Sequence, residues 1–160
     1  MQTFLPSPDL AKGAAVLDRA RLGKQRVEVL QIANALFVPG YGWAQHPAVA
    51  MWRGCERALL EYGLFICDEW LARGYHDSVA GKLHALGEAH GIDMADEDFE
   101  TPWWLGEPDF HRSHRSNLLR KDRAFYERRF ERGLPDDLPY LWPQEEPGLF
   151  VEGERPLAAS

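Results

Sequence analysis

Apolar residues recur at helical spacing along most of the chain, and the clearest stretch lies between residues 18 and 36. They occupy positions Leu22, Val29, Ile32, Ala33 and Leu36. Residues three, four or seven apart share one face of an α-helix. Because Asp18 can cap such a helix and Pro39-Gly40 can end the segment, the sequence predicts an amphipathic helix over residues 18–36.

The longest apolar pattern begins at Pro47 and continues to Arg73-Gly74. Its members follow one another at steps of three or four residues: Val49, Trp52, Cys55, Leu59, Tyr62, Ile66 and Trp70. A proline in the first turn and a glycine after the last turn are typical helix boundaries. We therefore predict one long apolar helix at the centre of a small bundle, with Cys55 and Cys67 as core residues on it.

Weaker patterns complete the predicted bundle. We expect helices over residues 8–16, 78–90 and 107–132. The last could open at Glu107-Pro108 or at Ser113, since both are suited to a helix N-terminus. An acidic loop is expected over residues 93–100.

The C-terminal part of the chain is rich in proline. After Gly133, prolines stand at positions 135, 139, 143, 147 and 156. Proline lacks a backbone donor and interrupts regular structure. We therefore expect a helical domain over residues 1–143 and an irregular tail over residues 144–160. With 160 residues in total, the fold class predicted is all-α: a compact single-domain helical bundle with a long central apolar helix and a Pro-rich C-terminal tail.

Charge is distributed unevenly along this acidic chain. The net charge is −7, yet residues 11–26 carry +4 and residues 111–132 carry +5, which leaves −16 for all other residues. A site for a polyanion needs positive charge concentrated in one place, which two basic segments can supply. The negative charge on the other residues disfavours non-specific binding of anions. We predict that the segments converge, with Arg21, Lys24, Arg112 and Arg115 bordering one concave surface. The alternative is that both basic segments are solvated helix faces.

One carboxylate, Glu28, lies two residues beyond the first basic segment and on the same predicted helix. Arg21, Lys24, Gln25, Glu28 and Gln31 form a polar stripe at helical spacing, opposite the apolar face. Glu28 is therefore expected to face either solvent or a ligand. A carboxylate among cations is kept ionised, so Glu28 is the candidate catalytic carboxylate.

The second basic segment contains the repeat His111-Arg-Ser-His114-Arg-Ser. The two histidines have a spacing that could suit a metal, but the adjacent arginines would repel a cation, so we predict no metal site. We expect both histidines, with Arg112 and Arg115, to donate hydrogen bonds to phosphate oxygens. His46, just before Pro47, is predicted to cap a helix.

Other signals restrict the possible functions. The chain has no phosphate loop, HExxH, CxxC or GxSxG motif, which excludes the commonest classes of nucleotide-binding protein and hydrolase. The N-terminus lacks the features of a signal peptide, and no segment approaches the ~20 apolar residues of a membrane span. We expect a soluble, cytoplasmic protein without a cofactor.

Three motifs carry a resemblance to a known family. They are the stretch Leu17-Asp18 to Glu28, the elements Gly42-Trp43, His46-Pro47-Ala48 and Met51-Trp52, and the segment His111 to Asp122 followed by Tyr126. Together they resemble a bacterial branch of the pyrimidine-dimer DNA glycosylase (endonuclease V type) family, over most of residues 1–143. The resemblance implies a compact all-α protein.

The family resemblance also implies a reaction. Members remove pyrimidine dimers when an N-terminal α-amine attacks the sugar, and a glutamate supports the imine intermediate and strand cleavage. Glu28 matches that glutamate. The family's amine belongs to a small second residue, whereas Gln2 here is too large for usual methionine removal, so the amine is expected on Met1. In a well-studied phage member of the family an arginine directly precedes the glutamate, and Val27 stands at that position here.

The leading hypothesis is therefore a DNA repair glycosylase with AP-lyase activity on damaged double-stranded DNA, acting as a monomer. The catalytic residues would be Glu28 and the Met1 α-amine. The nucleic-acid-binding residues would be Arg19, Arg21, Lys24, Gln25, Arg26, His111, Arg112, His114, Arg115 and Lys121. One alternative is a non-catalytic nucleic-acid-binding protein on the same fold, and another is an enzyme of a different class acting on a small phosphorylated or nucleotide substrate.

Overall fold

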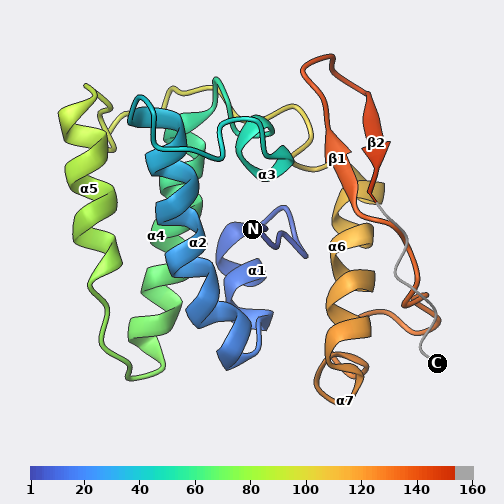
Figure 1. Ribbon diagram of the computed structural model, residues 1–160. Coiled ribbons are helices and arrows are strands. Elements are labelled where there is room, and N and C mark those ends of the chain that lie inside the picture. The colour runs from blue at the N-terminus through green and yellow to red at the C-terminus, as the bar shows by residue number, and fades with distance from the viewer. Residues whose placement is uncertain (154–160) are drawn as a thin grey trace.

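The computed structural model describes residues 1–153, which contain seven helices and one two-stranded sheet (Figure 1). The helices are α1 (Leu10–Val16), α2 (Arg19–Phe37), α3 (Pro47–Ala50), α4 (Glu56–Ala72), α5 (Val79–Ala89), α6 (Pro108–Lys121) and α7 (Arg123–Tyr126). The strands are β1 (Leu141–Pro143) and β2 (Phe150–Glu152), paired antiparallel. The predicted all-α class is confirmed. Among the described residues, no helix has the length and apolarity needed to cross a membrane.

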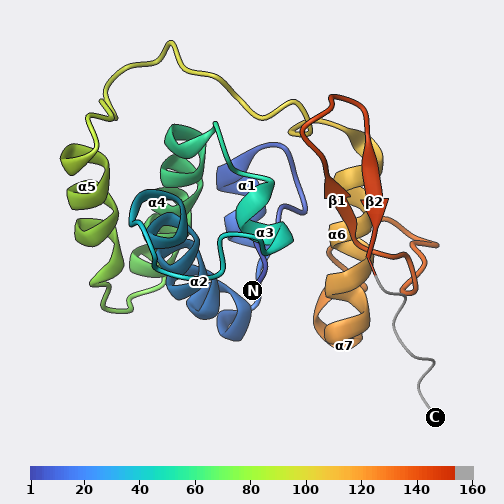
Figure 2. The same ribbon diagram turned by 45° about the horizontal axis from the view of Figure 1, so that its top comes forward.

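The elements form two groups with the N-terminal segment between them. Helices α2, α4 and α5 lie side by side, while α6, α7 and the β1–β2 hairpin stand on the other side of the molecule (Figure 1). The segment between α5 and α6 arches across the top and joins the two groups (Figure 2). This arrangement leaves α2 facing the C-terminal end of α6.

Helix α2 agrees with its prediction to within one residue at each end. The Asp18 carboxylate accepts a hydrogen bond from the Arg21 backbone N–H at 3.4 Å and so caps the helix. Leu22, Val29 and Ile32 are fully buried against the rest of the core. Helix α4 approaches very closely here, because a Cβ at Gly63 would lie 2.6 Å from Val29 Cγ1.

The predicted continuous helix from Pro47 to Arg73 is wrong. Helix α3 ends at Ala50 and α4 begins at Glu56, and between them Gly54 has φ +85°, a backbone conformation that L side chains rarely adopt. His46 caps α3 as predicted, through Nδ1 accepting from the Ala48 N–H at 3.0 Å. The apolar spacing continued across the break because both helices bury residues in the same core.

The predicted last helix to Arg132 is also wrong, since it divides at Asp122. Helix α6 ends at Lys121, and Asp122, with φ −152°, lies outside helical geometry. Its carboxylate then accepts from the Phe125 N–H at 3.1 Å and caps the short α7. A single residue therefore ends one helix and starts the next.

The predicted irregular tail over residues 144–160 is wrong for residues 150–152, which form β2. Phe150 packs on Trp103 and Phe110, with ring centroids 4.9 and 5.9 Å away. The prolines do not prevent this hairpin, because Pro143 ends β1 and Pro147 lies between the strands. Residues 154–160 of the predicted tail lie outside the described residues.

Candidate active site

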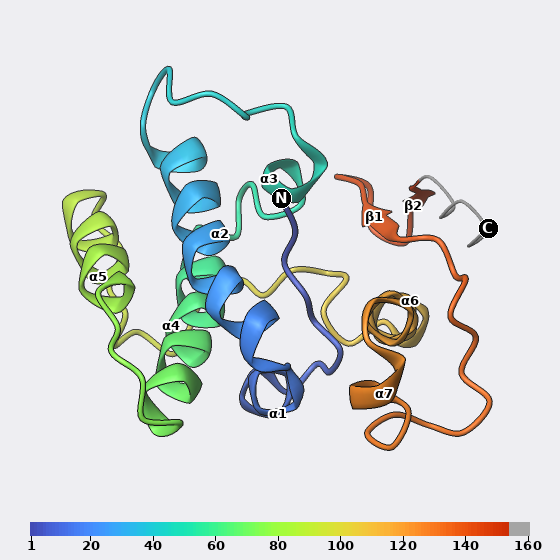
Figure 3. The same ribbon diagram turned by 60° about the horizontal axis from the view of Figure 1, so that its bottom comes forward.

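The N-terminal segment is extended and runs between α2 and α6 (Figure 3). Side chains hold its backbone from both sides. The Phe4 N–H donates to Gln25 Oε1 on α2 at 2.8 Å, and the Leu5 N–H donates to His114 Nδ1 on α6 at 3.0 Å. The Tyr62 hydroxyl of α4 lies 2.7 Å from the Phe4 carbonyl oxygen. The start of the chain is thereby placed by three different helices.

Gln25 connects this segment to the candidate catalytic carboxylate. Besides accepting from Phe4, its side chain donates through Nε2 to the Gln2 carbonyl oxygen and to Glu28 Oε2, both at 2.8 Å. The residue is only 1% exposed. The predicted contact of Gln25 with nucleic acid does not fit this burial, because both ends of its amide are occupied inside the protein.

The predicted role of His111 and His114 as hydrogen-bond donors to phosphate oxygens does not fit their positions in the structure either. Both imidazoles are buried. His111 donates from Nδ1 to the Leu5 carbonyl oxygen at 2.8 Å and accepts at Nε2 from the Gly106 N–H at 2.9 Å. Burial lowers the pKa of His111 and lowers that of His114 to about 3, which keeps both rings neutral. They bind the protein's own backbone.

The neutral His114 leads to a prediction for stability. An unfolded imidazole titrates near pH 6.5, so between that pH and about 3 the unfolded chain binds the extra proton at His114. The free energy of unfolding should therefore fall as pH falls below 6.5, by about 1.4 kcal/mol per pH unit from this residue. In His114→Asn, where Oδ1 can still accept from Leu5, urea denaturation between pH 6 and 5 should show a slope smaller by that amount. An unchanged slope would contradict a neutral, buried His114.

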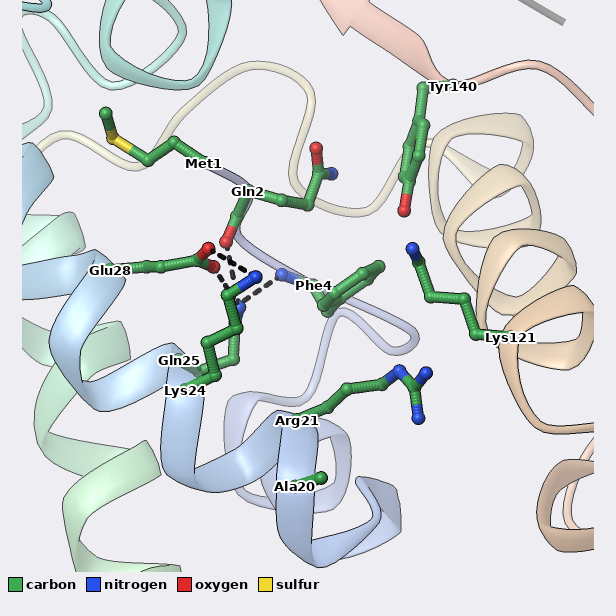
Figure 4. Close-up of a pocket in the computed structure, with 10 residues that line it drawn as sticks. All are labelled: Met1, Gln2, Phe4, Ala20, Arg21, Lys24, Gln25, Glu28, Lys121 and Tyr140. Atoms are coloured by element: carbon green, nitrogen blue, oxygen red, sulfur yellow. Dashed lines mark hydrogen bonds and ion pairs between the residues drawn. The ribbon is translucent and has the colours of Figure 1, made fainter. Parts of the chain in front are cut away.

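Glu28 lies on the wall of a cavity of about 430 Å³ between α2, the end of α6 and the N-terminal segment (Figure 4). Its lining residues are Met1, Gln2, Phe4, Ala20, Arg21, Lys24, Gln25, Glu28, Lys121 and Tyr140. In Figure 4 the side chains of α2 face Lys121 and Tyr140 across this space. The volume is within the range of specific ligand sites.

The Glu28 carboxylate is held from two directions. One oxygen accepts from Gln25, and the other, Oε1, lies 3.5 Å from Lys24 Nζ. A solvent- or ligand-facing position was predicted; the residue is only 6% exposed, and it lines the pocket. A fixed carboxylate beside a cavity can stabilise positive charge that develops on a bound molecule or move a proton there.

Three cations stand around this pocket, and they come from both basic segments. Arg21 and Lys24 belong to α2, and Lys121 belongs to α6. Burial lowers the pKa of Lys121, and the nearby Arg21 and Arg120 add to this effect. The second basic segment therefore reaches the pocket through Lys121, but the predicted concave surface bordered by Arg21, Lys24, Arg112 and Arg115 is not formed.

The predicted positions of Arg112 and Arg115 are wrong. Arg112 is exposed and lines a separate hollow together with Asp109 and Glu152. Arg115 Nε donates to Glu131 Oε2 at 3.0 Å, and its Nη1 donates to the Pro6 carbonyl oxygen at 2.9 Å. On a helix, residues 112 and 115 share a face that differs from the face of residue 121.

Arg19 and Arg26 do not line the Glu28 pocket but a neighbouring hollow, which shares Ala20 and Lys24 with it. Arg26 forms an ion pair with Asp77 and stacks over the Trp70 ring at 4.4 Å. Arg19 lies over the Tyr75 ring at 5.1 Å. Both contacts join α2 to the end of α4 and the loop after it, which indicates a structural role for these two arginines.

Two residues near the site were missed as site residues from sequence. Tyr140 lines the pocket from the Pro-rich segment, and His46 lies close enough to the N-terminal ammonium to feel its charge. Burial lowers the pKa of His46, and that ammonium lowers it further while Glu28 opposes the shift. The only sequence signal for these two residues was the His46-Pro47-Ala48 motif of the family resemblance. Within residues 1–153, no group of three or more His, Cys, Asp or Glu side chains is arranged to hold a metal ion.

Comparison with known families gives one decisive result. A family model described as pyrimidine dimer DNA glycosylase matches residues 1–82, just over half of the 160 residues. The chain belongs to the pyrimidine dimer DNA glycosylase family. No curated protein and no solved structure matches it.

The region matched by the pyrimidine dimer DNA glycosylase family contains most of the pocket. Met1, Gln25 and Glu28 lie within it, as do the cations of α2. Lys121 and Tyr140 come from beyond residue 82. Family membership indicates a DNA repair glycosylase, and the pocket is the candidate place for its chemistry.

Proposed function

We propose that this protein is a DNA glycosylase with associated AP-lyase activity on duplex DNA that contains a pyrimidine dimer or an abasic site. It would act as a cytoplasmic monomer, with the Met1 α-amine as nucleophile and Glu28 as the supporting carboxylate. The observation that carries this proposal is that Met1 and Glu28 line one pocket surrounded by cations from both basic segments.

The proposed reaction follows from these groups. The amine lone pair attacks C1′ of the damaged nucleotide, and the bond from C1′ to the base breaks with its electrons leaving on the base. The nitrogen then loses one proton, its lone pair expels the ring oxygen O4′ from C1′, and O4′ takes up a proton, which leaves an open-chain protonated imine. A proton then leaves the adjacent sugar carbon and the 3′ phosphate departs, which cleaves the strand. In this proposal Glu28 stabilises the cationic imine and accepts a proton.

The N-terminal segment is well suited to carry such a nucleophile. A terminal amine on a free chain end would lose much of its advantage through disorder, since orientation supplies a large part of catalysis. Here the backbone of residues 2, 4 and 5 is hydrogen-bonded to Gln25, His114 and His111. These contacts support a preorganised amine.

The test of this function is reductive trapping. Borohydride converts an imine into a stable amine, so the protein incubated with an abasic duplex should become covalently linked to the DNA. The adduct should be absent with an undamaged duplex. If folded protein with a free terminal amine binds the abasic duplex but is never trapped, the glycosylase/lyase proposal fails and the non-catalytic binding function takes its place.

The pocket cations yield a prediction for DNA binding. In the double variant Lys24→Ala/Lys121→Ala, the affinity for DNA should fall whatever the DNA sequence. The slope of log K against log salt concentration should become shallower by nearly one unit for each lost phosphate contact. Arg112→Ala is the control, because Arg112 is an exposed cation that lines a different hollow. Fluorescence anisotropy at several salt concentrations measures both effects. A slope reduced only by the Arg112 change would place the DNA on the other face of α6.

A further inference from the structure

The loop between α2 and α3 exposes aromatic residues beside the pocket. Tyr41 is 43% exposed and Trp43 is 64% exposed, the largest fraction among the exposed large apolar side chains of residues 1–153. No Asp, Glu, Lys or Arg occurs between Glu28 and Arg53. This surface therefore offers no charge to phosphates, although the pocket near it is rich in cations.

The backbone of the loop holds Trp43 in an unusual conformation. Trp43 has φ +62° and is the non-glycine residue with positive φ among those described, with Gly40 at +76° and Gly42 at +97° just before it. Bulky residues rarely adopt this region, and such strain is found where a side chain has a function. The His46 N–H donates to the Trp43 carbonyl oxygen at 2.9 Å, which fixes the turn.

A row of aromatic rings connects Trp43 with the pocket. The Trp43 and His46 ring centroids are 6.0 Å apart, and the His46 and Trp142 centroids are 6.3 Å apart. Trp142 lies 6.0 Å from Tyr140, which lines the pocket itself. Figure 3 shows the loop after α2 arching over to α3, next to β1. The row thus begins at an exposed indole and ends at the proposed catalytic cavity.

We propose that the loop of residues 38–46 is a base-contacting element, and that Trp43 inserts into the base stack at the lesion. This inference rests on the proposed function, because it takes duplex DNA at the pocket as given. An enzyme that reaches C1′ of a stacked nucleotide has to unstack it, and an apolar side chain can fill the space left behind. Indole faces stack on any base, so the contact needs no sequence preference.

The uncharged character of the loop favours bases over other parts of DNA. Phosphates would be bound by Arg21, Lys24 and Lys121 at the pocket, while base faces are apolar and suit an indole. The cationic pocket and the uncharged loop therefore suit different parts of DNA, and they are adjacent in the fold. An exposed tryptophan at this place is therefore better explained by bases than by a second protein chain.

The experiment uses Trp43→Ala, Trp43→Phe and a matched control, Leu71→Ala, since Leu71 is a 48% exposed apolar residue on α4. The probe is a duplex with a tetrahydrofuran abasic analogue and 2-aminopurine in the opposite strand. Wild-type protein and Leu71→Ala should raise the fluorescence as the base unstacks. Trp43→Ala should abolish most of this rise and weaken binding about ten-fold, as expected for one lost stacking contact. Trp43→Phe should retain most of both.

Several results would overturn the inference. A Trp43→Ala protein that binds the duplex and raises fluorescence as wild type does would refute it. So would sedimentation showing a wild-type dimer that Trp43→Ala dissociates while DNA binding stays unchanged, because the loop would then be an interface between copies.

The proposed function is tested separately on a single-stranded abasic oligonucleotide, which needs no wedge. Wild-type protein and the Leu71→Ala control should both be trapped there by borohydride. If wild type gives no trapped adduct but the Trp43-dependent fluorescence persists, the lyase chemistry fails while the base-contacting role of Trp43 stands.

Discussion

Strand cleavage by Glu28→Gln should be about 100- to 10,000-fold slower than by wild type, the usual contribution of a positioned acid–base group. The change removes the charge but keeps an oxygen that can accept from Gln25 Nε2, which lies 2.8 Å from Glu28 Oε2. The ion pair with Lys24 is lost, but that lysine side chain is 72% exposed, so stability should change by no more than about 1 kcal/mol. Single-turnover kinetics on an abasic duplex and a thermal melt measure the two quantities.

A matched control separates catalysis from helix stability. Glu69→Gln makes the same chemical change and also removes an ion pair between residues four apart, since Arg73, directly after α4, has its Nε 2.8 Å from Glu69 Oε1. It should cleave as wild type does. Equal cleavage by Glu28→Gln and wild type would exclude Glu28 from the reaction, and a loss shared by both variants would point to general destabilisation.

Blocking the terminal amine should abolish both imine trapping and strand cleavage. Two residues added before Met1 would move the amine by about 7 Å, beyond the short reach that nucleophilic attack requires. The rest of the pocket should stay intact, because Gln25 and His114 hold residues 2, 4 and 5 independently of the amine. Borohydride trapping of the extended protein on an abasic duplex measures the effect.

The control for the extension is the same two residues added after Ser160. That protein should be trapped normally. Selective acetylation of the terminal amine gives a second route, since α-amines titrate near pH 8 and lysines near 10.4. If the N-terminally extended protein is still trapped, the nucleophile is a lysine, and the two lysines at the pocket, Lys24 and Lys121, become the candidates.

Local sequence signals were sufficient where a helix is specified by its own residues. The cap at Asp18 and the apolar face of α2 predicted that helix correctly, and the weaker pattern over residues 78–90 predicted α5. The polar stripe also selected Glu28 and Lys24 from sequence, since helical spacing alone puts them on one face. Periodicity and capping depend on residues close together in the sequence, so they can be recognised without knowledge of the fold.

Local signals failed where one residue changes the direction of the chain. Periodic apolar residues continued across Gly54 and Asp122, so two helix breaks were missed. The Pro-rich segment formed a hairpin because Phe150 could bury itself against Trp103 and Phe110. Such packing between distant segments leaves no periodic trace in the sequence.

The roles of the His-Arg-Ser repeat were decided by the fold. Sequence chemistry predicts that histidine and arginine side by side bind anions, but α6 turns His111 and His114 toward the N-terminal segment and leaves Arg112 exposed on another face. The buried backbone of Leu5 needs hydrogen-bond partners, and the two imidazoles supply them. Whether a polar side chain binds a ligand or the protein itself depends on what lies opposite it, and only the tertiary structure brings residue 5 to within 3.0 Å of residue 114.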